Sequence, residues 1–393
     1  MKKLLALAIV LMMVLPTLAL GAAPEYKGTI TLGIYEPASG DNGAGGKQET
    51  LGVYYANHVA PTVELSDGVY KVELVEVDNQ SSTDKAPAAA QQLVSAGASI
   101  VLGSYGSSVS IAAADIFADA GLVAIALSAT NPQVTLGNDL YYRICYLDPF
   151  QGTVLAGYAQ EQFGAKKAYT LAQLGNDYDV GLVNYFTEAF KANGGEVVGE
   201  TFPEGTSDFG AYLTKAVNEG AEVIFSPTST TYAAQIITQA GANGVKLPIL
   251  AGDTWDSSVI LDAAKATDLE VSVSTFFDEG DTSGKAAEFV KGFKEWLNAN
   301  PDKLANNGGN DIVAAVTALG YDGYMVALEA LKLADSAERE DIADIMADVT
   351  YEGVTGQIVF GENGDAVRSQ AFIKKTAGGT GAWEFVKVQS IAK

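Results

Sequence analysis

The sequence predicts an α/β protein of two domains, each built on a parallel sheet with helices on both faces. Short apolar runs, such as residues 100–102 and 122–127, alternate along the chain with helical segments. Strands and helices in alternation favour a parallel sheet between two helical layers. The 393 residues also exceed what one hydrophobic core usually organises, and both halves of the chain share the same rhythm.

The elements of the first half follow from apolar periodicity and from the residues that interrupt it. Residues 71–78 (KVELVEVD) alternate as a half-buried strand does, whereas residues 38–47 are polar and glycine-rich and are expected to form a loop. Gly121 is expected to end the helix before the strand at 122–127. We expect strands at 29–34, 70–78, 100–102 and 122–127, and helices at 48–58, 84–96 and 107–120.

The second half repeats the pattern after an extended aromatic run at 141–150. A new helix is expected to begin near Gln151, and a glycine turn at 378–381 separates two strands of a C-terminal hairpin. We expect strands at 168–172, 196–202, 223–226, 249–252, 270–277, 370–375 and 383–388, and helices at 180–193, 209–219, 232–240, 284–300 and 310–334.

Residues 1–23 have the features of a secretory signal peptide. Two lysines precede an apolar run at 4–15, and small residues at 19–23 suit a cleavage site. The apolar run is shorter than the ~20 residues that a membrane span needs, and no cysteine near the cleavage site offers a lipid anchor. We therefore expect a mature protein that is exported to the periplasm and is not inserted in the membrane.

Charge and cysteine content narrow the possible partners. The full chain carries a net charge of −24, and loss of Lys2 and Lys3 would leave 22 basic against 48 acidic residues, a net charge of −26. Such a surface argues against nucleic acid or an anionic membrane as a partner. Cys145 is the only cysteine, so no disulfide within the chain is possible, and we expect it to be a buried small hydrophobe.

Two polar loops follow neighbouring predicted strands. Gly106 and Ser107 come after the strand at 100–102, and Ser128 and Thr130 come after the strand at 122–127. Ligands of open α/β sheets bind at the carboxyl ends of strands, and the free N–H groups of a helix start hold anions such as carboxylates. The alternative is that Ser107 only caps a helix and that Thr130 only forms a turn.

Motifs for catalysis or metal binding are absent from the sequence. The glycines at 43–46 begin a dinucleotide-binding pattern, but Gln48 stands where its last glycine belongs, and no phosphate-binding P-loop occurs. His58 is the only histidine, so neither a hydrolase triad nor paired zinc ligands are supported, and there is no calcium-loop spacing. We expect no enzymatic activity, no cofactor and no metal.

Several segments together resemble the branched-chain amino-acid-binding proteins, which are periplasmic receptors of amino-acid ABC transporters. The resemblance covers nearly the whole mature chain, and it rests on the order and spacing of its pieces. These are PASG at 37–40, VLGSYGSS at 101–108, SATNP at 128–132, NDYDVG at 176–181, AGDTWDS at 251–257 and YEGVTGQIVFGENGD at 351–365.

The resemblance implies a type I periplasmic-binding-protein fold, in which two Rossmann-like lobes with parallel sheets are joined by three hinge crossings. Lobe 1 would comprise 24–145 and 275–352, and lobe 2 would comprise 146–274 and 353–393. The implied function is capture of a small amino acid, branched-chain or otherwise aliphatic, between the lobes and delivery to a membrane permease. The alternatives are a receptor for amides, urea or aromatic acids, and a sensory subunit that feeds a signalling partner.

The resemblance also assigns roles to individual residues of the cleft. Ser107, with the backbone around Gly106, would hold the ligand α-carboxylate, and Ser128 and Thr130 would share it and accept from the ammonium group. From lobe 2, Tyr178 would close over the ligand.

Two further parts of the cleft follow from the same resemblance. Asp253 would face the ammonium group, with Thr254 as a rival and a helix N-cap as the structural alternative for Asp253. Gly45 stands where some relatives place an aromatic residue, so we expect it to leave room for a larger ligand beside Tyr105. Ser229, in a hydroxyl-rich loop, would make the lobe 2 side of the pocket more polar.

Overall fold

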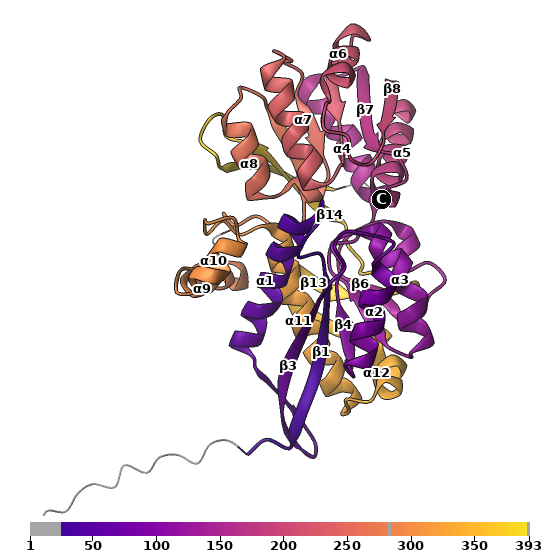
Figure 1. Cartoon of the computed structure of the whole chain (residues 1–393), viewed down its shortest axis with the longest axis vertical. Coiled ribbons are helices and arrows are strands. Elements are labelled where there is room, and N and C mark those ends of the chain that lie inside the picture. The colour runs from indigo at the N-terminus through magenta and orange to yellow at the C-terminus, as the bar shows by residue number, and fades with distance from the viewer. Residues whose placement is uncertain (1–24, 282–283, 391–393) are drawn as a thin grey trace, which may run out of the picture.

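The computed structural model describes residues 25–281 and 284–390 as two lobes arranged along one long axis (Figure 1). The predicted signal peptide at 1–23 lies outside the described residues. Lobe 1 is the body around the first sheet, and lobe 2 is the body around the second. In the part of the chain that is described, no helix is both long and apolar enough to cross a bilayer.

The sheet of lobe 1 has six strands in the order β2-β3-β1-β4-β5-β6. Its strands are parallel except for β2, which pairs antiparallel with β3 at the edge and was not expected from the sequence. A short connection joins these two strands, and such a hairpin can only be antiparallel. The strands are β1 (Gly28–Glu36), β2 (Thr62–Leu65), β3 (Gly68–Asp78), β4 (Ile100–Leu102), β5 (Val123–Ala126) and β6 (Tyr141–Arg143).

The central strands of lobe 1 bury both faces. In β1, Ile30, Leu32 and Ile34 join the apolar cluster that contains α1 (Gly43–Val59) and α11 (Ala315–Ala334), while the next residue, Tyr35, joins the cluster of α2 (Ala86–Ser95) and α3 (Ser107–Asp119). Successive side chains of a strand point to opposite faces. An unbroken apolar run in the sequence is therefore divided between two helical layers.

The expectation of a loop over 38–47 is wrong for its last part, because α1 begins at Gly43. The glycines serve close packing: a Cβ on Gly46 would collide with the carbonyl of Pro37. Further along α1, a Cβ on Gly52 would collide with the backbone of Thr317 in α11. A glycine-rich polar sequence is typical of loops, and here tertiary packing overrides that preference.

Smaller helices and a short hairpin complete the described part of lobe 1. Two of these α-helices, α10 and α12, were not expected from the sequence. The helix expected at 310–334 begins at Ala315 instead. The remaining elements are α9 (Gly284–Asn298), α10 (Pro301–Asn306), α12 (Arg339–Ile345), η1 (Pro132–Val134), η3 (Met346–Asp348), β12 (Thr350–Gly353) and β13 (Gly356–Val359).

Lobe 2 has a seven-stranded sheet in the order β15-β14-β11-β10-β9-β7-β8. Its last two strands are antiparallel, so both sheets have a parallel centre and an antiparallel edge. The elements are β7 (Lys167–Gln173), β8 (Glu196–Phe202), β9 (Val223–Phe225), β10 (Ile249–Ala251), β11 (Val271–Thr275), β14 (Gln370–Thr376), β15 (Trp383–Ser390), α4 (Asp148–Phe163), α5 (Asp177–Ala192), α6 (Gly210–Asn218), α7 (Thr230–Ala242), η2 (Asp253–Trp255) and α8 (Ser258–Lys265), the last of which was not expected.

The chain passes between the lobes three times, after β6, after β11 and before β14. A buried ion pair lies close to two of these passages: Lys374 Nζ is 3.0 Å from Asp256 Oδ2, and both side chains are 1% exposed. Asp256 also accepts hydrogen bonds from Thr275 Oγ1 at 2.7 Å and from the N–H of Ala315 at 3.3 Å. One carboxylate thus ties β14 and β11 in lobe 2 to the start of α11 in lobe 1.

The lobes are closed upon each other. The carbonyl of Asp41 in lobe 1 accepts hydrogen bonds from Thr230 Oγ1 at 3.1 Å and from Thr231 Oγ1 at 3.0 Å in lobe 2. On the other side of the cleft, Ser108 Oγ accepts from the N–H of Asp177 at 2.9 Å. The hydroxyl-rich loop at 228–231 therefore joins the lobes as well as bordering the cleft.

Candidate functional site

The N-terminus of α3 faces the cleft with its first N–H groups free of side-chain caps. Its N-cap is Gly106, which has an extended backbone (φ −95°, ψ 127°) and makes no capping hydrogen bond. The first N–H groups of a helix have no partner within the helix, and the helix dipole makes that end positive. The arrangement is one that holds a carboxylate.

Ser107 and Ser108 do not cap α3, because they are its first two residues. Ser107 Oγ instead accepts a hydrogen bond from the N–H of Asn131 at 3.3 Å, which joins the two polar loops of lobe 1. Asn131 in turn donates from Nδ2 to the carbonyl of Asp177 in lobe 2 at 2.8 Å. The alternative that Ser107 is only a cap is therefore wrong.

A cavity of about 40 Å³ lies between the lobes at this helix terminus. From lobe 1 it is lined by Tyr105, Gly106 and Ser107, and from lobe 2 by Tyr178, Ser229 and Thr254, among others. Five of the residues singled out from the sequence, together with the rival Thr254, therefore line one cavity. The other four, Gly45, Ser128, Thr130 and Asp253, do not line it.

Three buried hydroxyl groups near the cleft make no well-formed hydrogen bond. They are Ser128 Oγ, Thr130 Oγ1 and Ser229 Oγ, in residues that are at most 3% exposed. Carboxyl groups lie beside the first two, and Ser229 lines the cavity. Burying a hydroxyl without a partner costs about 1–3 kcal/mol in proteins.

Ser128 and Thr130 lie beside buried carboxyl groups that the sequence did not single out. Burial raises the pKa of Glu49 to about 8. Hydrogen bonding with the Ser128 hydroxyl and with the carboxyl of Glu36 lowers this pKa in part. Burial likewise raises the pKa of Asp148 to about 8, opposed by the Thr130 hydroxyl. The carboxyl groups of Glu49 and Asp148 make no well-formed hydrogen bond.

Asp253 is buried behind the cavity wall and is linked to it through Tyr178. Its Oδ1 accepts from Gln151 Nε2 at 2.7 Å and from the Tyr178 hydroxyl at 3.1 Å. Burial raises the pKa of Asp253 to about 6, while the bonds from Gln151 and Tyr178 lower it. The Tyr178 hydroxyl oxygen is also 3.5 Å from Thr254 Oγ1. Asp253 and Thr254, the two candidates for contact with the ammonium group, therefore both contact Tyr178. Asp253 caps no helix.

Gly45 leaves no room for a larger ligand, contrary to the expectation from the sequence. A Cβ on Gly45 would lie 2.6 Å from the hydroxyl oxygen of Tyr105 and closer still to its ring. The tyrosine ring thus occupies the space in front of this glycine. The residues are distant in sequence, and only the fold brings them together.

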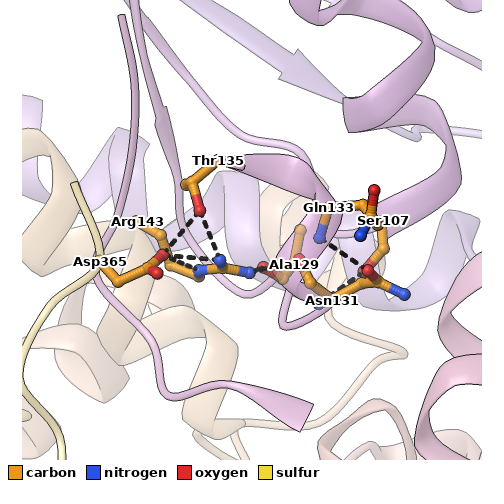
Figure 2. A network of polar contacts seen from close by, with 7 residues as sticks. All are labelled: Ser107, Ala129, Asn131, Gln133, Thr135, Arg143 and Asp365. Carbon is orange, nitrogen blue, oxygen red and sulfur yellow. Dashed lines mark hydrogen bonds and ion pairs between the residues drawn. The ribbon is translucent and has the colours of Figure 1, made fainter. Parts of the chain in front are cut away.

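The loop that carries Ser128 and Thr130 is held by an arginine that sequence reasoning missed (Figure 2). Arg143, at the end of β6, is fully buried and donates to the carbonyls of Ala129 at 3.0 Å and Asn131 at 2.6 Å. Its other nitrogens meet Asp365 Oδ1 at 2.8 and 2.6 Å and Thr135 Oγ1 at 2.8 Å. An arginine inside the apolar run YYRICY was the available signal, since a buried charge needs partners.

The loop before α3 is held by a second buried group. Glu36, at the end of β1, accepts the N–H of Tyr105 at 2.7 Å. Burial and the nearby carboxyl of Glu49 raise the pKa of Glu36 well above its usual range. Two carboxyl groups this close and this buried favour sharing a proton.

A larger cavity of about 550 Å³ lies at the hinge and contains none of the predicted site residues. It is lined by Phe276, Phe277 and Arg368, among others. Arg368 already donates to the carbonyls of Ile144 at 2.9 Å and Thr355 at 2.7 Å. The buried unpartnered polar side-chain atoms of the described residues do not include any from its lining.

Comparison with known proteins identifies the family of this chain. The family described as periplasmic binding protein matches residues 29–380. Among curated proteins, an amino acid binding protein of Pseudomonas aeruginosa is 28% identical over 82% of this chain and 79% of its own length. A Leu/Ile/Val-binding protein homolog 1 of Brucella suis is 26% identical over 88% of this chain and 91% of its own.

Solved structures give the same result. A leucine binding protein, LivK, from Thermotoga maritima superposes with a TM-score of 0.83 at 30% identity, covering 92% of this chain and 99% of that one. The substrate-binding protein LivJ of Streptococcus pneumoniae, solved in complex with isoleucine, gives 0.79 at 28% identity, with 92% and 99% covered. A benzoate complex from R. palustris, 19% identical with a TM-score of 0.80 over 93% and 98%, shows the shared fold alone. The chain therefore belongs to the periplasmic binding protein family, as a non-enzymatic solute-binding protein of the ABC-transporter type related to the branched-chain amino-acid-binding proteins.

Proposed function

We propose that this protein captures a small zwitterionic amino acid, of the branched-chain or another aliphatic class, between its lobes and delivers it to an ABC permease. The observation that carries the proposal is the cavity between the lobes, which lies against the uncapped N-terminus of α3. The relatives named for leucine and isoleucine support the amino-acid class.

Lobe 1 supplies the groups for the α-carboxylate. The N–H groups of the first turn of α3 and the Ser107 hydroxyl are donors on the cavity wall. Hydrogen bonds between a carboxylate and such donors are about twice as strong as neutral ones. This end of the cavity therefore selects the anionic end of the ligand.

Lobe 2 supplies acceptors for the ammonium group. Tyr178 and Thr254 line the cavity, and Asp253 accepts from Tyr178 directly behind it. A positive charge at this position favours the ionised form of Asp253, whose pKa burial has raised to about 6. The ammonium group would thus offset part of the cost of burying this carboxylate.

Ligand capture is a hinge motion that brings these two half-sites together. The hydrogen bonds from Thr230 and Thr231 to Asp41, and from Asp177 to Ser108, form only when the lobes meet. They stabilise the closed form that a permease would recognise. We expect export to the periplasm, which agrees with the extracytoplasmic location that the family implies.

The test is a binding screen on mature protein that has been unfolded and refolded to remove carried-over ligand. Thermal shift and calorimetry would cover the common amino acids, amides, urea and aromatic acids. Ligand at a hundred times its Kd adds about 2.7 kcal/mol to the free energy of unfolding. We expect amino acids to bind and Ser107→Ala and Asp253→Asn to weaken binding, whereas Ser95→Ala, which alters only a bond within α2, leaves it unchanged.

Three outcomes would contradict the proposal in whole or in part. Binding of aromatic acids, amides or urea without any amino acid would retain the fold and reject the ammonium site. Amino-acid binding that both site variants leave unaltered would place the ligand elsewhere, and the hinge cavity would be the next position to examine. Recovery of a signalling protein in place of a permease from membranes would reject the transport role and keep the ligand.

A further inference from the structure

Tyr105 lines the cavity from lobe 1. It directly precedes Gly106 and Ser107 in the chain, and all three residues line the same cavity. The ring fills the space in front of Gly45, where an added Cβ would lie 2.6 Å from the tyrosine oxygen. The glycine is thus matched to the tyrosine, and together they leave no further volume in that direction.

Tyr105 is held in this position from several sides. Its N–H donates to Glu36 Oε2 at 2.7 Å, and its hydroxyl donates to the carbonyl of Thr254 at 2.9 Å across the cleft. Its ring forms a small apolar cluster with Ala314 and Val316, and the residue is only 4% exposed. Moving the ring aside would break a bond between the lobes and uncover this cluster.

The remaining volume is small. The cavity measures about 40 Å³, and on this measure one water molecule needs about 10–15 Å³. The space therefore accommodates a few water-sized groups, which is on the scale of the smallest amino acids. The isobutyl group of leucine would have to displace the Tyr105 ring. The hydrogen bond from the Tyr105 hydroxyl to the carbonyl of Thr254 would then be lost.

We infer that Tyr105 is the specificity-determining residue of this site and restricts the ligand to amino acids with compact side chains, such as glycine, alanine and serine. The inference rests on the proposed function and narrows it. It separates this chain from the relatives named for leucine and isoleucine, although the fold and the carboxylate site are shared.

The experiment measures Kd by calorimetry for glycine, alanine, serine, valine and leucine with refolded wild-type protein and three variants. Tyr105→Phe keeps the ring and removes only the bond to Thr254, so it is the matched control. Tyr105→Ala opens the space, and Tyr105→Leu opens part of it while keeping apolar contact with Ala314 and Val316. Circular dichroism and thermal unfolding establish that each variant is folded.

We expect the wild-type protein to bind alanine at least tenfold more tightly than leucine. Tyr105→Phe should weaken all ligands by a similar factor and keep this order, while Tyr105→Ala or Tyr105→Leu should reduce or reverse it. Wild-type binding of leucine as tight as that of alanine would overturn the inference and leave the proposed function intact. An unchanged order in both ring-removing variants would also overturn it. Failure of every amino acid to bind would overturn the proposed function itself, and this inference with it.

Discussion

Replacement of Arg143 by methionine should destabilise the protein strongly. Among the described residues, its guanidinium is the one positive charge in the hydrogen-bond network that Figure 2 draws. Arg143 is fully buried, and its ion pair with Asp365 measures 2.6 Å, with the Asp365 side chain 17% exposed. The substitution keeps a long apolar side chain and removes five hydrogen bonds. These run to Asp365 (twice), Thr135, Ala129 and Asn131.

The expected cost follows from what the substitution leaves behind. Asp365 keeps one donor, Thr135 Oγ1 at 2.9 Å, but loses its counter-ion, and the carbonyls of Ala129 and Asn131 lose the Arg143 donors. Breaking a buried pair by removing one partner costs about 3–5 kcal/mol. That is a large part of the ~5–15 kcal/mol that stabilises a typical domain.

Urea unfolding at pH 7 measures this cost, with two controls. Lys246→Met removes an exposed ion pair whose side chains are 74% and 95% exposed, and it should change the free energy of unfolding by less than about 0.5 kcal/mol. Arg143→Met with Asp365→Leu removes the unpaired charge as well, so the double variant should be more stable than Arg143→Met alone. A loss below about 1 kcal/mol in Arg143→Met would refute the reasoning.

The same substitution should affect the ligand site. Arg143 bonds to the loop that carries Ser128 and Thr130, and Figure 2 shows it reaching that loop from the side of Asp365. Ligand affinity of Arg143→Met, measured under conditions in which the variant is fully folded, should therefore fall. An unchanged affinity would mean that the loop keeps its position without the arginine.

Two other predictions concern pH and closure. Burial raises the pKa of Glu49 and of Asp148 to about 8. Between about pH 4.5 and pH 8 the folded state therefore binds more protons than the unfolded state. The free energy of unfolding of the ligand-free protein should fall as pH rises through this window. Glu49→Gln should flatten that slope, and stability that rises from pH 5 to pH 8 in the wild type would contradict the prediction. Thr230→Val removes one hydrogen bond between the lobes and, at about 0.5–1.5 kcal/mol, should weaken ligand binding about two- to tenfold. Thr214→Val, whose hydroxyl bonds only within α6, is the matched control, and equal affinities of the two variants would show that this contact does not stabilise the closed form.

The sequence by itself determined the alternation of strands and helices and the place of the ligand loops. Both depend on local signals: apolar runs such as 100–102 predict buried strands, and the glycine and serines that follow predict a polar turn into a helix. Because carboxyl ends of parallel strands meet at one edge of a sheet, the loops around Ser107 and Ser128 were expected together. The hydrogen bond from Asn131 to Ser107 joins them in the structure.

Only the tertiary structure decided which groups support and limit the site. Arg143 and Asp365 are 222 positions apart, and nothing local in either segment indicates their pairing. The absence of a side chain at Gly45 was equally compatible with a large ligand and with a neighbouring ring, and the fold places Tyr105 there. Local patterns determine what a segment forms, but the volume and charge of a cleft depend on which distant side chains the packing of the two lobes brings into it.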